Sequence, residues 1–427
     1  MGVVMSIGRI YSALGNSNSL LTLGVKDVSN SLGLTAGSYI TGDAVEGKDR
    51  FIDEFGTEAI WLFGIPVFKK VLDLGLFKPL KLDSNIDVRI FKNPEIFEKA
   101  KEFAPTQEIK NALEHVSNKQ KMFKGMYVAR FALSTLLTTA AYFGLTKFRH
   151  KYTEKQIEKD FFQKQDLSKK FTEHIPFSSS FSDIHKPKQP SFTGGGLQDF
   201  MFNPLKNLMI VDAAITGERF THARNKQDFV GYAIKEGAFW TFVYFAGDKI
   251  KQGFENLAKK KHNKSIDLDS RIYETDNLKN AFNNGSLSKS LKEFPVNGSD
   301  VEIYEFINKN PDNFVVKASK MSDIIPTLKK SDKIDTRKFI DTDAVKSVAI
   351  KLEKLKGEFE VSGEDLDGFL NSVKKLKRSA VIKNLGTCVG VLGVLVPLIM
   401  IAIRFSNKDN KEFQTKKEVE ARLAAKN

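Results

Sequence analysis

The sequence predicts a mainly α-helical integral membrane protein with two internally duplicated helical halves and a small α+β soluble insertion in the second half. Three observations predict this class: an internal repeat, two nearly uncharged segments of about 20 residues, and a net charge of +14 over 427 residues. Such an excess of basic residues favours an anionic partner. Many of the basic residues flank apolar segments, so we expect a lipid bilayer with anionic headgroups rather than nucleic acid.

A stretch at residues 40–63 recurs at residues 215–242. Each copy begins with a Thr-Gly-acid sequence, which indicates a turn, and continues through Lys-x-x-Phe to a Glu and an aromatic run. The equivalent lysines and glutamates are Lys48, Lys226, Glu58 and Glu236. Each apolar run is only about ten residues long, too short to cross a hydrocarbon core of roughly 30 Å. A buried, re-entrant or interfacial helix is therefore expected in each copy.

Two further blocks extend the repeat. Residues 87–91 match residues 269–273, which makes Arg89 and Arg271 equivalent. Two basic residues, six positions apart, then precede each long apolar segment. These basic residues are Lys124 and Arg130 before the uncharged run of the first segment, which begins at Phe131, and Lys377 and Lys383 before the second segment. Matched blocks in the same order predict an internal duplication.

The two long apolar segments, residues 126–146 and 384–403, are long enough to span a bilayer as helices. The first contains Arg130, which we expect to reach the headgroups, and the second ends at Arg404. A buried core helix is the alternative for the first segment. The basic residues that flank the first segment, and that suit headgroups, are Lys119, Lys121, Lys124, Lys147, Arg149 and Lys151.

Within the second segment, Gly386 and Gly390 have the spacing that lets another helix approach closely. The number of crossings decides how the halves are related. One crossing per half predicts an inverted repeat, whereas two crossings per half predict parallel hairpins. Basic residues lie on both sides of both segments, so the distribution of positive charge does not select an orientation.

These features divide the chain into consecutive parts. They are an N-terminal segment (1–38), the first repeat (39–151), a flexible linker (152–197), the start of the second repeat (198–282), a soluble insertion (283–373), the end of the second repeat (374–405) and a charged tail (406–427).

The insertion is expected to mix strands and helices. Short strands are predicted at residues 301–306, 314–318 and 357–361, and a helix is predicted at residues 341–355. Ser362 resembles the first residue of a capping box, which would start the next helix.

Residues 42–49 fit the Gly-x-x-x-x-Gly-Lys phosphate-binding loop up to its last position, where Asp49 replaces the Ser or Thr that holds Mg²⁺. Asp43 and Glu46 would repel phosphate inside such a loop, and the second copy of the repeat lacks the spacing. A turn that caps a helix is the preferred interpretation. A nucleotide-binding enzyme is therefore only a remote alternative.

Glu58 and Glu236 each precede an apolar run, and a carboxylate near membrane depth in both halves is a candidate ion or proton site. The preferred interpretation is an acid in the first turn of a helix, where the helix dipole favours negative charge. Arg89 and Arg271 each follow an Asp by two residues. They mark either a repeated partner-binding surface or, as we prefer, local ion pairs of little energetic value.

No catalytic, cofactor-binding or metal-binding residue is predicted, and Cys388 is the only cysteine. The basic runs at residues 259–261 and 374–378 lack interleaved aromatic residues, so nucleic acid is not an expected partner. We therefore expect a non-enzymatic integral membrane protein that scaffolds or organises protein partners, further copies of itself, or anionic lipid through its basic soluble regions. The alternative is a small-solute or ion transporter built from two repeats.

Overall fold

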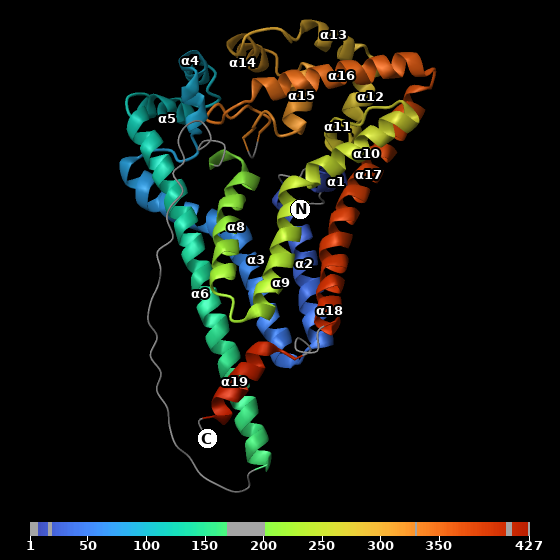
Figure 1. Ribbon diagram of the computed structural model, residues 1–427. Coiled ribbons are helices and arrows are strands. Elements are labelled where there is room, and N and C mark those ends of the chain that lie inside the picture. Colours follow the sequence, from blue (N-terminus) through green and yellow to red (C-terminus); the bar gives the residue numbers. More distant parts are fainter. Residues whose placement is uncertain (1–6, 16–18, 169–200, 329–330, 407–411, 426–427) are drawn as a thin grey trace. The chain divides into compact units, whose positions relative to one another are not determined.

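The computed structural model describes residues 7–15, 19–168, 201–328, 331–406 and 412–425 (Figure 1). These residues fold almost entirely into helices, and the only β-type pairing among them is one isolated bridge between Thr327 and Ile334. The chain divides into two compact units. The apolar-core unit comprises residues 1–23, 66–134 and 241–388, and the charged-core unit comprises residues 24–65, 135–240 and 389–427.

The apolar-core unit consists mainly of short helices. They are α1 (Ile7–Gly15), η1 (Asp73–Phe77), η2 (Lys78–Leu80), η3 (Val88–Lys92), α4 (Pro94–Glu102), α5 (Gln107–Ser117), the start of α6 (Gln120–Ser168), α10 (Gly247–His262), α11 (Ser270–Glu274), α12 (Asp276–Asn283), α13 (Ser286–Glu293), α14 (Asp300–Lys309), α15 (Phe314–Met321), α16 (Thr342–Ser362) and most of α17 (Leu366–Gly390).

This unit has an ordinary hydrophobic interior. Phe123 meets the rings of Phe77 and Phe91 edge to face, at centroid distances of 5.6 and 5.9 Å. All three side chains are buried, and such aromatic contacts add to the stabilisation that burial supplies.

The three strands expected in the insertion are wrong, because all three segments are helical. Residues 301–306 lie in α14, residues 314–318 in α15 and residues 357–361 in α16. Side-chain caps explain the first two: Ser299 forms a capping box before α14, and Asn313 accepts a hydrogen bond from the amide of Val315. Residues 357–361, whose alternating pattern resembled a third strand, form the end of the long helix α16.

The helix predicted at residues 341–355 is confirmed as part of α16, with Asp341 as its N-cap. The capping role expected of Ser362 is wrong, since Ser362 is the last residue of that helix and Gly363 follows with a φ of +65°. Asp365 takes the role instead, because its carboxylate accepts a hydrogen bond from the amide of Gly368 at 2.7 Å.

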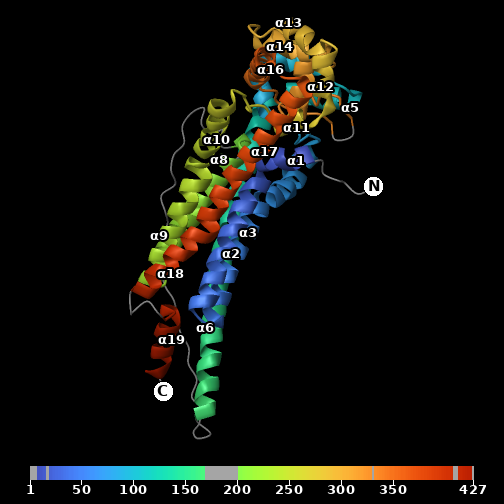
Figure 2. The ribbon, with the colours of Figure 1, turned by 90° about the vertical axis from the view of Figure 1, so that its right-hand side faces the viewer.

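The charged-core unit contains longer helices that run alongside one another in both views (Figures 1 and 2). They are most of α2 (Leu20–Thr41) and α3 (Ala44–Leu72), the rest of α6, α8 (Pro204–Thr221), α9 (Lys226–Phe239) with the start of η4 (Trp240–Phe245), η5 (Val391–Leu395), α18 (Val396–Ser406) and α19 (Gln414–Ala424). The linker expected at residues 152–197 starts as helix, because α6 continues to Ser168. Residues 169–197 lie outside the described residues.

The turn expected in both copies of the repeat forms only in the first. Gly42 lies between α2 and α3, as expected. Gly217, its equivalent, lies inside α8, and the chain turns only after Thr221. In the second copy, three additional residues separate the Thr-Gly-acid sequence from Lys226, the equivalent of Lys48. These residues move the turn along the chain.

The charged-core unit packs α2 against η5 backbone to backbone. A Cβ atom on Gly33 would stand 2.2 Å from the carbonyl oxygen of Gly393, and a Cβ on Gly393 would stand 2.9 Å from that of Ser29. The close approach expected at Gly386 and Gly390 is wrong, since no described residue would lie within 4 Å of a Cβ at either position. Helices approach this closely only where side chains are absent.

Both predicted spans lie within long helices. The helix at Gln120–Gln163 and the one at Leu366–Ser406 are long and apolar enough to cross a membrane, by length and composition. Only 28% and 22% of their most apolar windows are buried. A buried core helix, the alternative for the first span, would be mostly covered.

The arginines expected at headgroup level turn inward instead. Arg130 pairs with Asp73 at 2.7 Å in the apolar-core unit. Arg149 pairs with Asp53 at 2.7 Å in the charged-core unit. Arg404, for which no position was predicted, also lies in the interior of that unit and pairs with Glu46. An arginine next to an apolar run thus marks an interior ion pair here, rather than a contact with headgroups.

Candidate functional site

An acidic stripe on α3 organises the interior of the charged-core unit. Its residues recur at helical spacing, so they share one face over about 18 Å of the helix. They are Glu46, Asp49, Asp53, Glu54 and Glu58, and each is at most 8% exposed.

Neighbouring elements each direct one cation at this stripe. They are Arg149 from α6, Arg219 from α8, Arg224 from the turn after α8, Lys235 from α9 and Arg404 from α18. Arg224 donates two hydrogen bonds to Asp49, at 2.8 and 3.1 Å, and a third to Asp228 at 2.7 Å. Lys235 Nζ lies 2.6 Å from Glu54 Oε2. Buried charges persist only when paired in this way.

Arg219 is the most connected member. Its guanidinium donates hydrogen bonds to Asp53 at 3.3 Å, to Thr57 at 3.2 Å and to Glu236. It also lies over the rings of two tyrosines. These are Tyr142 and Tyr232, at 5.8 and 5.5 Å from their centroids. Arg219 thereby joins α3, α8, α9 and α6 in one polar cluster.

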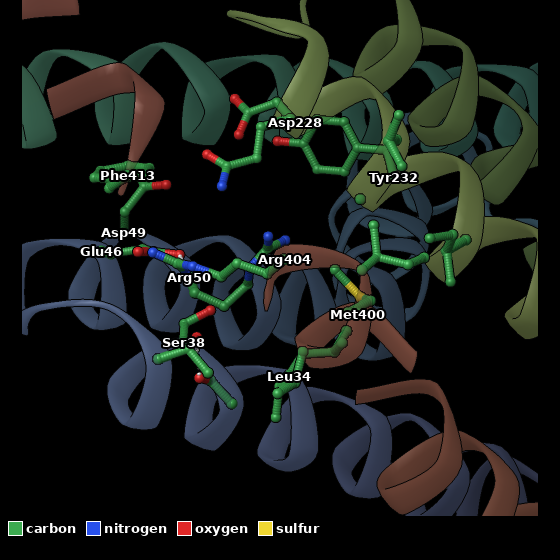
Figure 3. A pocket seen from close by; sticks show the side chains of 18 of the residues that line it. Leu34, Ser38, Glu46, Asp49, Arg50, Asp228, Tyr232, Met400, Arg404 and Phe413 are labelled. Atoms are coloured by element: carbon green, nitrogen blue, oxygen red, sulfur yellow. Dashed lines mark hydrogen bonds and ion pairs between the residues drawn. The ribbon is translucent and has the colours of Figure 1, made fainter. Parts of the chain in front are cut away.

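A pocket of about 90 Å³ opens beside the end of the network nearest the helix turns (Figure 3). Its charged lining consists of Arg50, Arg149, Arg224, Arg404, Glu46, Asp49 and Asp228. Arg50 is the most loosely held of these arginines, with carboxylate oxygens of Glu54 and Asp53 at 3.5 and 3.8 Å. The volume suits a small ion or a few water molecules, since pockets for larger organic ligands are typically ~300–1,000 Å³.

Glu58 and Glu236 are both buried, at 5% exposure each. Neither lies in the first turn of its helix, so the preferred interpretation of these acids as helix-dipole partners is wrong. Glu236 accepts hydrogen bonds from Arg219 and, at 3.1 Å, from Thr216. Neither carboxylate oxygen of Glu58 accepts a hydrogen bond from any described residue.

Lys48 and Lys226 are exposed and take no part in the network. The phosphate-loop pattern folds into the first turns of α3, where Asp43 caps the helix by accepting hydrogen bonds from the amides of Val45 and Glu46 at 3.0 Å each. The interpretation of this stretch as a helix-capping turn is confirmed. Glycine and lysine inside a helix do not form a loop that wraps phosphate.

Arg89 and Arg271 lie in the apolar-core unit, and each forms an ion pair with the Asp two residues before it; Arg271 also pairs with Asp323 at 2.6 Å. Asp87 accepts hydrogen bonds from the amide of Arg89 at 2.9 Å and from its side chain at 2.7 Å. Asp269 binds Arg271 in the same manner, at 2.8 and 3.1 Å. Burial acts to raise the pKa of Asp269, but the hydrogen bonds and positive charge of Arg271 outweigh it and hold that pKa below its usual range.

A third Asp-x-Arg pair, which the sequence reading missed, has the same geometry. Asp335 accepts from the amide of Arg337 at 3.2 Å and from its side chain at 2.9 Å. Six residues after each of the three Asp residues, a polar side chain caps a helix. These caps are Asn93 for α4, Thr275 for α12 and Asp341 for α16. The repeated unit is therefore a structural device that starts helices.

Comparison with known proteins identifies no relative. No protein-family model, curated protein or solved structure matches this chain. The role of the buried charge network is therefore inferred from its own residues. Their spacing on α3 was the one sequence signal that would have indicated it.

Proposed function

We propose that this chain is a non-enzymatic integral membrane protein whose charged-core unit lies in the bilayer. The observation that carries the proposal is the polarity of this unit, which has charges inside and apolar side chains outside. The buried charged residues are Lys26, Glu46, Asp49, Asp53, Glu54, Glu58, Arg149, Asp212, Glu218, Arg219, Asp228, Lys235, Glu236 and Arg404.

The exterior of the same unit presents large apolar side chains from several helices. Leu32 on α2 is 56% exposed, Phe63 on α3 63%, Phe143 on α6 40% and Leu398 on α18 54%. Large contiguous apolar patches are rare on soluble monomers, so apolar side chains exposed on several helices of one unit favour a lipid environment. Lipid tails solvate such side chains at no cost, whereas charged side chains in a bilayer turn to the interior and pair.

The short helices of the apolar-core unit would then act outside the hydrocarbon and bind anionic headgroups or a protein partner. Lys259, Lys260 and Lys261 support this role, because they are exposed at the end of α10. The second basic run, residues 374–378, is less available to bind headgroups or a partner than its sequence indicates, because three of its side chains are already paired. Lys374 and Arg378 bond Glu274, and Lys377 bonds Glu255 and the carbonyl of Ile266.

Cysteine accessibility tests the membrane proposal. In a Cys388→Ala background, Leu398→Cys is expected to resist a membrane-impermeant maleimide until detergent is added. The matched control, Lys260→Cys, is expected to react from one side of sealed vesicles, because Lys260 is exposed outside the predicted spans. Equal labelling at both positions in intact vesicles, together with release of the protein by alkaline carbonate, would overturn the proposal.

Passage of a proton or small ion through the charged-core unit is the second candidate function. The burial of Glu58 and Glu236 favours it, because surface exposure of these acids would have excluded a shared interior path. Ionisable groups buried among membrane helices commonly mark ion pathways and proton relays. The small pocket beside Arg50 offers an entrance of matching size.

Proteoliposomes test this candidate. Vesicles that contain the protein and entrapped pyranine are expected to equilibrate an imposed pH difference faster than protein-free vesicles of the same lipid. Arg50→Gln is expected to slow the exchange, since it alters the entrance, whereas Lys155→Gln on the exposed part of α6 is expected to leave the rate unchanged. Equal rates with and without protein would remove ion passage as a function.

A further inference from the structure

The charge network changes character along α3, away from the pocket. Carboxyl groups from four helices gather in the part of the unit that contains Glu58. They are Asp27 from α2, Glu54 and Glu58 from α3, Asp212 from α8 and Glu236 from α9. Each acts electrostatically on at least one other member of this carboxyl cluster.

Fewer cations serve the carboxyl cluster than it has acids. The cations are Arg219 on α8 and Lys235 on α9, and Arg219 also binds Asp53 outside the cluster. The adjoining part of α6, residues 135–146, carries no charged residue, and its titratable side chain there is Tyr142. Residues 384–403, which include η5, are also uncharged. Acidic groups therefore outnumber cations inside this part of the unit.

Glu58 is the member whose two carboxylate oxygens are both buried without a hydrogen-bond partner among the described residues. Its carboxylate is 5% exposed, and neither oxygen receives a hydrogen bond within the described part of the chain. Its electrostatic neighbours include two acids, Asp27 and Glu54, against the single cation Lys235. Asn30, one turn from Asp27 on α2, is fully buried, and neither polar atom of its amide has a hydrogen-bond partner among the described residues.

An ionised carboxylate in these surroundings is strongly unfavourable, because it is removed from water without a compensating donor. One proton on Glu58 converts –COO⁻ to –COOH, which reduces the negative charge of the cluster by one and supplies a hydrogen-bond donor. The described residues contain no group of three or more His, Cys, Asp or Glu placed to hold a metal ion. A proton therefore fits the cluster better than a divalent cation does.

We propose that the carboxyl cluster is an exchangeable proton-binding site with Glu58 as its proton carrier. The inference rests on the proposed passage of a proton or small ion through the charged-core unit, and it names the proton as that ion. The pocket is then the polar approach, and the cluster is the position where the proton is held. Lys235 pairs with Glu54, and Arg219 pairs with Glu236.

The chain contains a reporter for this site. Trp61 and Trp240 are its only tryptophans, and Trp61 lies one turn from Glu58 on α3, at 1% exposure. In a Trp240→Phe protein, the emission of Trp61 is expected to change in a single step with pH, because the charge on Glu58 alters the electric field at the indole. Glu58→Gln is expected to abolish this step. Glu158→Gln, at a less buried carboxyl on α6, is expected to leave it intact.

Infrared difference spectra supply a second readout on the same samples. Wild-type protein is expected to lose the carbonyl band of a protonated carboxylic acid as pH rises, and Glu58→Gln is expected to lack that component. If Glu58→Gln does not fold, Glu58→Asp retains a titrating group and is expected to move the pH of the step. A flat Trp61 response, or a response unchanged in Glu58→Gln, would overturn the proposal even if proteoliposomes conduct protons. A Glu58-dependent step without proton flux would support the site and remove only the passage.

Discussion

Replacing Arg219 with Met is expected to lower the free energy of unfolding by about 3–5 kcal/mol, because it breaks a buried ion pair and leaves acidic partners uncompensated. The Arg219 side chain is 4% exposed, and so is that of Asp53. Among the described residues, Glu236 would keep only Thr216 and a more distant Lys235, whose Nζ is 3.9 Å away. Denaturant titration of the purified protein, followed by circular dichroism, measures the loss.

A surface pair in the same unit supplies the control. Arg422 on α19 pairs with Glu154 on α6 at 3.0 Å, and both side chains are almost half exposed. Arg422→Met is expected to cost less than about 1 kcal/mol, because water already solvates both charges. Adding Glu236→Gln to Arg219→Met is expected to recover part of the loss, since it removes one uncompensated charge. Equal losses for Arg219→Met and Arg422→Met would show that the buried network is not a major source of stability.

Gly33→Ala is expected to destabilise the protein by about 1–3 kcal/mol, although alanine is the better helix former. The new methyl group would stand 2.2 Å from the carbonyl oxygen of Gly393 and 2.7 Å from Cγ of Pro397. The first obstacle is backbone, so α2 and η5 would have to separate. The same unfolding measurement detects the change.

Gly386→Ala is the matched substitution with the opposite expected sign. Gly386 is helical, and no described residue lies within 4 Å of the position that a Cβ would take. Removing glycine from an open helical position is expected to stabilise the protein by roughly 0.5–1 kcal/mol. If both substitutions stabilise, α2 and η5 do not pack as closely as described. If both destabilise, the cost arises from something other than their contact.

Local sequence signals predicted two helix starts well. Asp341 precedes α16 and Asp43 caps α3, both at positions where Asp is favoured. The predicted strands failed for a related reason. Val301 and Val315 follow capping residues by only two positions, and a helix that has been started by a cap accommodates β-branched residues readily.

The repeat remains a prediction, although one contact agrees with it. Trp61 and Phe239 stand at the same distance along their helices from the equivalent lysines, and their rings meet edge to face at 5.9 Å. Two features differ between the copies. The turn lies at different positions, and Glu58 and its counterpart Glu236 have different partners. Glu236 is paired with Arg219, whereas Glu58 has no hydrogen-bond partner among the described residues, so equivalent positions in the two copies have different surroundings.

By itself, the sequence determined that this protein is mainly helical, that two of its helices are long and apolar enough to cross a membrane, and that the phosphate-loop pattern is a helix start. These properties depend on residues within a few turns of one another. Only the tertiary structure decided which charges enter the interior. Arg404 and Glu46 are 358 positions apart, and Arg224 and Asp49 are 175 apart. A local pattern cannot distinguish an arginine that reaches a headgroup from one that meets a buried acid, because the acid is brought to it only by folding.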